Sequence, residues 1–238
     1  MDHVQQLEVF KAQTSNVRRL DAARRQIRRS INHALRRSDD AAEEAHTIVL
    51  ALLYCAWMEA TLLKLLCTPY GLSPIEIEQI KSAQQTSGIG AAWVECIDVG
   101  LRRVGEQPKT GDLPNIRQRL CKLIETFVKS PAELRNKIAH GQWVTCLNRD
   151  RTAVNADLTG KLAKLDVVEL ERWFEAGRGL ADIFEALIES PRRHFRGTYW
   201  KTLAELEERM SATKSWSRES RLDVLRRRPV RAPQTTAG

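Results

Sequence analysis

The chain has 238 residues, of which 42% are apolar and 29% charged, a composition that suits a globular domain with a real core and excludes a low-complexity, disordered chain. Its five cysteines are odd in number and widely spaced, without a CxxC pair, so they indicate neither a zinc site nor a disulfide framework. We expect core thiols in a reducing cytoplasm. The net charge of +8 is unevenly distributed, which points to a polyanionic partner.

Arginine is concentrated in the first predicted helix. Eight arginines lie within residues 18–37, and apolar residues of the same segment recur every three, four or seven positions, as in an amphipathic helix. On a helical wheel one outer face carries Arg18, Arg25, Arg29 and Arg36. Such a surface is typical of nucleic-acid binding, although a merely solvated basic face has the same pattern. We take these four arginines as candidate contacts to RNA phosphates.

Helical periodicity continues along most of the chain. We expect further helices from Asp39 or Asp40 to about Cys67, from Ser73-Pro74 onward, from Ala91 to Val104, from about Pro114 to Lys129, and over about 130–140, 165–189 and 192–210. The apolar stretch from Ile48 to Leu66 is broken by Glu59 and Lys64, and its helical spacing favours a buried core helix over a membrane span. The N-terminal residues form no apolar signal-peptide core, so we expect neither secretion nor a membrane partner.

A different pattern follows residue 141. Trp143–Leu147 and Thr152–Val154 flank a polar turn, Asn148–Arg151, in the manner of a β-hairpin. Beyond residue 210 the chain is rich in Ser, Arg and Pro, apart from a turn of helix that the sequence allows near Leu222–Arg226. We therefore predict an all-α helical bundle over residues 1–210, with a small β-hairpin after residue 141, and a basic, disordered tail over residues 211–238.

The residues best suited to chemistry lie between Glu133 and Gly141. Ser-Pro at 130–131 followed by Glu133 predicts a capped start for a short helix, and Gly141 predicts its end. Asn136 and His140 are four residues apart and share a face of this helix. Arg135 lies about 140° around the axis from His140, so the two converge only through the long arginine side chain or through a second copy of the helix.

The motif Arg135-Asn136-x-x-x-His140 resembles that of the HEPN superfamily, in which an arginine, often followed by asparagine, precedes a histidine by four to six residues. The segment Tyr54–Ala60 is similar to the aromatic and acidic core-helix segment of many HEPN proteins, and a helical bundle with a late motif helix also agrees. The resemblance covers residues 15–210 as architecture, but only the hexapeptide is specific. The arginine–histidine spacing alone is weak evidence for the family, since Arg28 and His33 have the same spacing without the asparagine.

The resemblance implies a metal-independent endoribonuclease, of the kind found among toxins and phage-defence effectors. In such proteins two protomers or domains supply Arg/His pairs to one composite site. One good motif in this chain then implies a cytoplasmic homodimer that acts on RNA without metal or cofactor, with an antitoxin or regulatory protein as a further partner. HEPN toxins paired with a minimal nucleotidyltransferase commonly have tyrosine two residues after the histidine, where this chain has Gln142, so control of that kind is not expected.

The residue types suit RNA cleavage. A guanidinium at Arg135 can hold a phosphate through two hydrogen bonds and stabilise charge in the transition state. His140 can exchange a proton with the 2′-oxygen or the leaving 5′-oxygen, and Asn136 can orient it. Attack by the 2′-hydroxyl requires RNA, so DNA should be spared. Lys137 is a candidate phosphate contact, and Glu59 a candidate partner of Arg135.

Purely structural explanations of these residues stay open at this point. Arg135 can pair with an acid for structural reasons, His140 can be a capping or packed histidine, and Lys137 can be a solvated lysine. A non-catalytic HEPN module that binds RNA or a partner protein through its basic helix is the main alternative. A regulatory subunit of a larger complex is a third.

Overall fold

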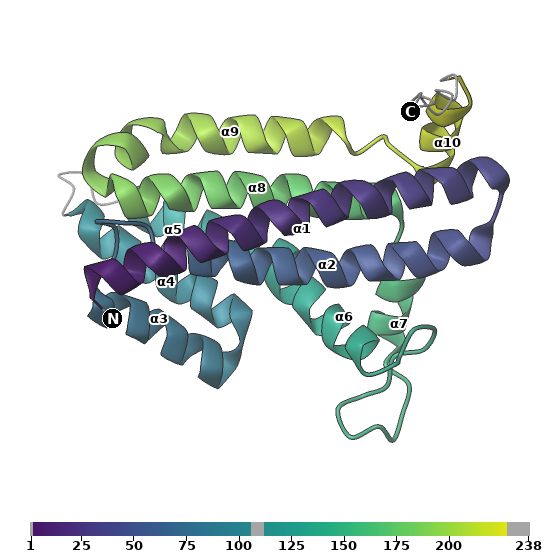
Figure 1. The fold of residues 1–238 in the computed structure, drawn as a ribbon, viewed down its shortest axis with the longest axis horizontal. Helices are drawn as coiled ribbons and strands as arrows, with labels where there is room; N and C mark the ends of the chain where they lie inside the picture. The colour runs from purple at the N-terminus through teal and green to yellow at the C-terminus, as the bar shows by residue number, and fades with distance from the viewer. Residues whose placement is uncertain (1, 106–111, 228–238) are drawn as a thin grey trace, which may run out of the picture.

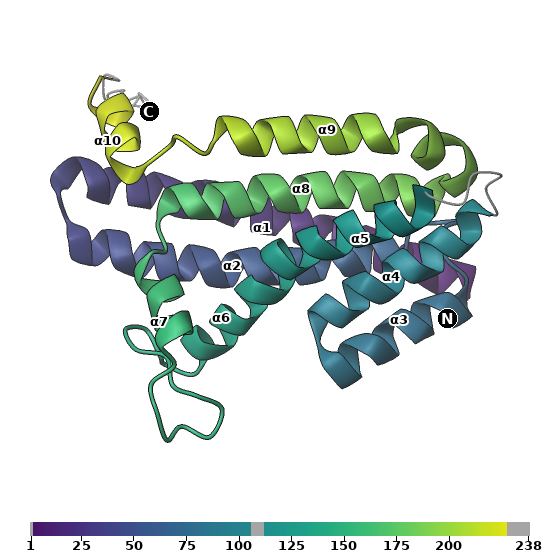
Figure 2. The same cartoon turned by 180° about the vertical axis from the view of Figure 1, so that it is seen from behind.

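The computed structural model describes residues 2–105 and 112–227, and over these ranges the fold is all-α (Figure 1). Its helices are α1 (His3–Arg37), α2 (Asp40–Leu66), α3 (Pro74–Ser87), α4 (Ile89–Val104), α5 (Asp112–Ile124), α6 (Ser130–Ala139), α7 (Ala156–Ala163), α8 (Val167–Glu189), α9 (Arg196–Ala212) and α10 (Arg218–Arg227). The long helices α1, α2, α8 and α9 run side by side (Figure 1). Helices α4 and α5 cross in front of α1 and α2 in Figure 2, and α3, α6 and α7 extend below them. Two π-helical turns, Glu125–Lys129 and Pro191–Phe195, lead into α6 and α9.

Helix α2 forms the centre of the core and packs against α1, α6 and α8. Its Tyr54 and Trp57 are buried and meet Phe174 of α8, with ring centroids 5.0 and 5.7 Å away. Gly177 permits this close approach, because a Cβ built there would lie 2.8 Å from the sulfur of Met58. The core therefore fixes the face of α2 that points away from it, and this face carries Glu59.

One described helix, α2, is long and apolar enough to cross a membrane by length and composition alone. Of its most apolar window, 56% is buried inside the fold. A core helix meets the same criterion, so this finding is weak evidence for a membrane span.

Most of the predicted helices are confirmed, with physical causes that are visible in their caps. The Asp39 carboxylate accepts the Ala42 N–H at 3.1 Å and starts α2. Ser73 and Glu76 form the reciprocal capping box that starts α3. Helix α1 is longer than its arginine-rich segment and begins at His3.

The predicted cap at Ser130 is wrong. Lys129 and Ser130 both have helical backbone angles, and no side-chain hydrogen bond caps α6. The chain instead passes from α5 through the π-turn Glu125–Lys129 into α6, and the two helices form one long diagonal rod in Figure 2. Pro131 is tolerated because a wider turn precedes it, which removes the need for its missing N–H.

The predicted β-hairpin is also wrong, since the described residues contain no strand. Leu147 and Val154 form only an isolated antiparallel bridge. The turn folds around the Asn148 side chain, whose Oδ1 accepts the Thr152 N–H at 2.9 Å. Val144 and Val154 stay 77% and 60% exposed, so no apolar face exists to be buried by longer pairing. Helix α7, capped by Asn155, follows directly and was not anticipated.

A disordered tail from residue 211 is wrong for the described part of that segment. Helix α9 continues to Ala212, and α10 packs against α1 and α8. Arg218 of α10 donates to the buried carboxylate of Glu43, with Nε 2.8 Å from Oε1, and also pairs with Asp40. Leu225 is buried in the same docking. A buried carboxylate without this partner would be costly, so α10 belongs to the folded body. Residues 228–238 lie outside the described part.

Candidate functional site

The C-terminus of α6 is closed by a Schellman motif. The Gln142 N–H donates to the Lys137 carbonyl and the Gly141 N–H to the Ile138 carbonyl, both at 3.0 Å. Gly141 has φ 78°, a conformation that glycine adopts without strain, so its predicted role as the residue that ends the helix is confirmed. This geometry places His140 at the C-cap, with its side chain exposed.

The loop after α6 is tied back to the helix by side chains of three residues. Lys137 Nζ donates to the Leu147 carbonyl at 2.6 Å, and Trp143 Nε1 donates to the Ile138 carbonyl at 3.1 Å. The Gln142 side chain accepts the Leu147 N–H at 2.7 Å. The Lys137 ammonium therefore holds the loop, and its contact with phosphate stays a prediction.

Arg135 points from α6 toward α2. Its guanidinium forms an ion pair with Glu59, and the two side chains are 34% and 39% exposed. The expectation that Glu59 contacts Arg135 is confirmed. Because the pair is partly open to solvent, the remaining guanidinium donors of Arg135 can still meet a ligand.

A cysteine that sequence reasoning assigned only to the core lies beside this pair. Cys55 is buried and hydrogen-bonds the Pro131 carbonyl at 3.5 Å. Burial raises the pKa of the Cys55 thiol to about 12, while Arg135 acts in the opposite direction. A thiol with that pKa stays protonated at neutral pH, so Cys55 is no nucleophile here. Its position four residues before Glu59 on α2 was the available signal.

Asn136 and His140 lie on the outer side of α6. Both are exposed, and among the described residues neither side chain makes a hydrogen bond or ion pair. The structure thus brings Arg135 together with Glu59, but it joins Arg135 to neither Asn136 nor His140 by a direct contact. This agrees with the offset of about 140° around the helix axis that five residues place between Arg135 and His140.

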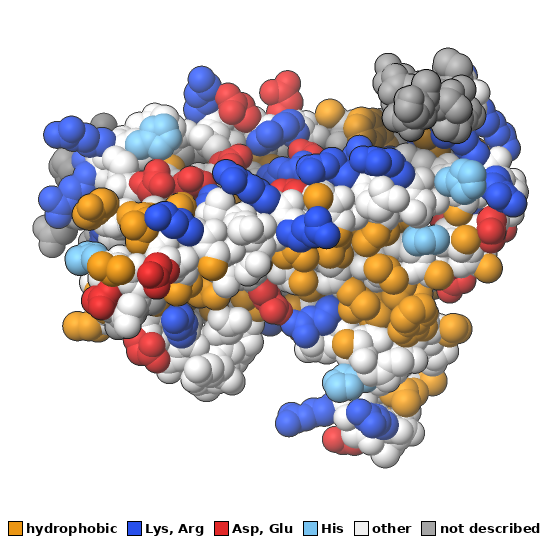
Figure 3. Space-filling model, in the orientation of Figure 1, with side chains coloured by type: hydrophobic (Ala, Val, Ile, Leu, Met, Phe, Trp, Pro, Cys, Tyr) orange, Lys and Arg blue, Asp and Glu red, His pale blue; other side chains and the backbone are white. Residues whose placement is uncertain are grey.

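The arginines of α1 divide between two faces. Arg18, Arg25 and Arg29 are exposed, and Lys and Arg side chains form a row over α1 in Figure 3. Arg36 behaves differently, because its Nε and Nη2 both donate to the Leu225 carbonyl at 3.3 Å. All four predicted contacts are exposed, and Arg36 also anchors α10.

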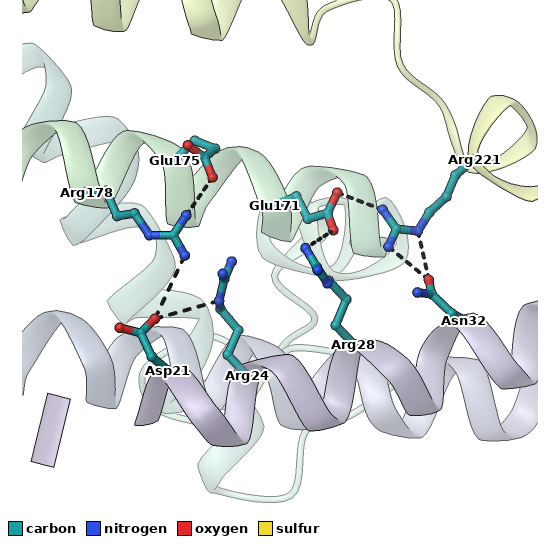
Figure 4. Close-up of polar contacts among 8 residues, drawn as sticks. All are labelled: Asp21, Arg24, Arg28, Asn32, Glu171, Glu175, Arg178 and Arg221. Carbon is teal, nitrogen blue, oxygen red and sulfur yellow. Dashed lines mark hydrogen bonds and ion pairs between the residues drawn. The ribbon is translucent and has the colours of Figure 1, made fainter. Parts of the chain in front are cut away.

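The inner face of α1 forms a polar network with α8 and α10 (Figure 4). Arg28 pairs with Glu171 at 3.3 Å, and Arg221 of α10 binds both Glu171 and Asn32. Arg178 likewise reaches Asp21 at 3.8 Å. Sequence reasoning did not separate these structural arginines from the outer ones.

Arg24 is the most buried arginine of this network. Its guanidinium lies 4.9 Å from the centre of the Phe174 ring. Burial, with Arg178 and Arg28 nearby, lowers the pKa of Arg24. Its Nε forms an ion pair with Asp21 at 3.8 Å (Figure 4) but makes no hydrogen bond within the described structure, so Arg24 contributes packing beside this long ion pair.

Within residues 2–105 and 112–227, no group of three or more His, Cys, Asp and Glu side chains is arranged to hold a metal ion. No protein-family model, no curated protein and no solved structure matches the chain. The residues of the site therefore carry the functional argument.

Proposed function

We propose that this chain is a HEPN-type endoribonuclease that cleaves RNA through Arg135, Asn136 and His140. The observation that carries the proposal is the pairing of two features on one short helix. A partly exposed guanidinium is oriented by Glu59, and an exposed imidazole sits at the C-cap five residues later. Both groups are accessible to a phosphate without any change in the core.

The chemistry follows from these groups. Arg135 binds the scissile phosphate and stabilises the charge that develops on its oxygens. His140 transfers a proton to or from the 2′-oxygen or the 5′-oxygen, and Asn136, one turn earlier, orients the imidazole. The 2′-hydroxyl attacks phosphorus, the bond to the 5′-oxygen breaks, and a 2′,3′-cyclic phosphate is left.

The active species in this proposal is a homodimer. Arg135 turns toward α2 while His140 is exposed at the end of α6, so one chain presents a divided site. A two-fold axis near α6 would place His140 of one protomer beside Arg135 of its partner. Exposed apolar side chains close to α6 support such a contact: Trp143 is 41% exposed and Val144 77%.

The direct test is incubation of purified protein with total RNA in EDTA. Cleavage should persist, spare DNA, and yield 2′,3′-cyclic phosphate ends. His140→Ala should abolish it, whereas His194→Ala, which alters another exposed histidine in the turn before α9, should not. Loss of wild-type cleavage in EDTA, or equal cleavage of DNA, contradicts the mechanism.

A non-catalytic module that binds RNA is the second candidate. The specific observation in its favour is that Arg135 already has a carboxylate partner and makes no contact with His140. Exposed Arg18, Arg25 and Arg29 would then carry the function. RNA binding without cleavage, unaffected by His140→Ala, would establish this alternative. The role as a toxin or phage-defence effector rests on the family resemblance alone.

A further inference from the structure

A concave pocket of about 650 Å³ lies at the α1–α2 turn, and no residue of the motif helix α6 lines it. The last turns of α1 contribute Arg29, His33 and Arg37, and the first turns of α2 contribute His46. Figure 3 shows Lys/Arg and His side chains together at this end of the molecule. Its volume falls within the range of pockets that hold small ligands.

The cations in this pocket have few internal partners. His33 and Arg37 are exposed, and their side chains make no hydrogen bond or ion pair with other described residues. Arg29 makes one hydrogen bond, to the Gln26 side chain at 3.3 Å. These groups contrast with Arg28 on the inner face of the same helix, which is paired with Glu171.

The pocket has a clear excess of positive charge. Three arginines line it, because Arg36 joins Arg29 and Arg37, and Asp39 is the single carboxylate. That carboxylate already caps α2 through the Ala42 N–H. Like charges held close together in a concave surface raise the local potential for anions.

His46 adds a ring nitrogen to the pocket lining. Its Nδ1 lies 2.5 Å from the Ala42 carbonyl, which fixes the ring and keeps Nε2 for another contact. His46 thus lies on the facing helix, opposite the arginines of α1.

A purely structural explanation covers only part of this cluster. Cations in the last turn of a helix interact favourably with its dipole, which accounts for Arg36 and Arg37. Arg29 lies two turns earlier, and His46 belongs to α2. Their convergence on one pocket has no such cause.

We propose that this pocket is a phosphate-binding site, occupied by a phosphate of a nucleic-acid strand or of a free nucleotide. Its lining includes none of Arg135, Asn136, His140 and Glu59, and His46 lies 13 residues from Glu59 on α2, or about 20 Å along the helix. One phosphate cannot touch both sites. The proposal requires binding only and does not rest on RNA cleavage.

The test measures binding of short single-stranded DNA, which lacks the 2′-hydroxyl and so separates binding from the cleavage proposed above. The pocket variant is Arg29→Ala with Arg37→Ala. The control is Arg193→Ala with Arg209→Ala, which removes two exposed arginines from the π-turn before α9 and from α9 itself. Fluorescence anisotropy is recorded over a series of salt concentrations for strands with a 5′-phosphate or a 5′-hydroxyl.

The pocket variant should bind about tenfold more weakly than wild type. The slope of log K against log salt should fall in magnitude by about 1.4, since each arginine neutralises one phosphate of a single strand. The control should match wild type in both. Loss restricted to the 5′-phosphorylated strand assigns the pocket to a terminal phosphate, and equal loss for both strands assigns it to backbone phosphates. Competition by AMP at the same site assigns it to a free nucleotide.

Wild-type binding by the pocket variant, with every strand and with AMP, overturns the proposal. Both arginines are exposed, so the variant should fold, and a thermal melt checks this. His33→Gln provides a second variant of the same pocket with a smaller change. If it too binds as wild type does, the cluster is a solvated basic surface.

Discussion

Arg135 offers the sharpest test of the proposed site, because its contribution to stability can be measured separately from the chemistry proposed for it. Its ion pair with Glu59 is more than one-third exposed on the Glu59 side, and pairs at that exposure contribute about 0–1 kcal/mol. The buried side chains of Leu134 and Ile138 hold α6 on the core independently. We therefore expect Arg135→Ala to lower the free energy of unfolding by no more than about 1 kcal/mol, or Tm by about 2–4 °C.

The cleavage rate should respond on a different scale. Removing a group that stabilises transition-state charge commonly lowers the rate about 10²-fold or more, so Arg135→Ala should lower the cleavage rate by at least about 10²-fold. Arg135→Lys keeps the charge and the pairing with Glu59 but lacks the planar fork that holds a phosphate through two hydrogen bonds. It should therefore melt as wild type does and still cleave a labelled RNA slowly.

A matched control is available on α5. Arg117 pairs with Asp98 through two hydrogen bonds, at 2.6 and 2.9 Å, in a similarly exposed setting. Arg117→Ala should cost a comparable amount of stability and leave the cleavage rate unchanged. The reasoning is refuted if Arg135→Ala unfolds the protein at ordinary temperature, or if Arg135→Lys cleaves at the wild-type rate.

Three further outcomes are expected. Gly177→Ala would place a methyl 2.8 Å from a methionine sulfur of α2 and should destabilise the fold by about 1–3 kcal/mol. Gly160→Ala points into open space within α7 and should stabilise the fold by up to about 1 kcal/mol. Urea denaturation measures both changes in the free energy of unfolding, and changes of the same sign contradict the packing argument. The Cys55 thiol has its pKa raised by burial to about 12 from an ordinary 9.0, so the stability it lends is complete below pH 9 and is lost as pH rises toward 12. Between pH 8 and pH 11, wild type should lose about 2–3 kcal/mol more than Cys55→Ala in denaturant titrations, and identical losses would show that burial does not perturb this thiol. Mixing inactive Arg135→Ala and His140→Ala protomers should restore some RNA cleavage if each chain lends one residue to a shared site, and a strict monomer by light scattering that still cuts RNA rules the composite site out.

Local signals in the sequence predicted the fold where a helix end depends on its own neighbours. Ser73 with Glu76, and Asp39, cap α3 and α2 through hydrogen bonds that span only three residues. The same kind of signal failed at Ser130, where a Ser-Pro-x-Glu pattern lies inside a continuous helical rod. The π-turn that absorbs Pro131 has no sequence signature that we could apply.

The site was predictable to the same extent. An unpaired carboxylate in the apolar run of α2 would be costly, and this argument led from Glu59 to Arg135. The partners of Lys137 and Arg36 could not be found in this way, because both donate to backbone carbonyls, which every residue possesses. Docking of α10 was missed for a similar reason: Arg218 reaches Glu43 from 175 positions away.

Net charge alone therefore overstates the surface available to a polyanion. Arg28 and Arg221 form ion pairs with Glu171 inside the α1–α8–α10 network, and Arg36 donates to a backbone carbonyl of α10. Removing α10 would consequently do two things at once, since it would delete basic residues and also leave Glu43 without its arginine partner and Glu171 with Arg28 alone. Weaker RNA binding after such a truncation could not be assigned to lost phosphate contacts. Point substitutions at the outer arginines of α1 avoid this coupling, because those side chains hold no other helix in place.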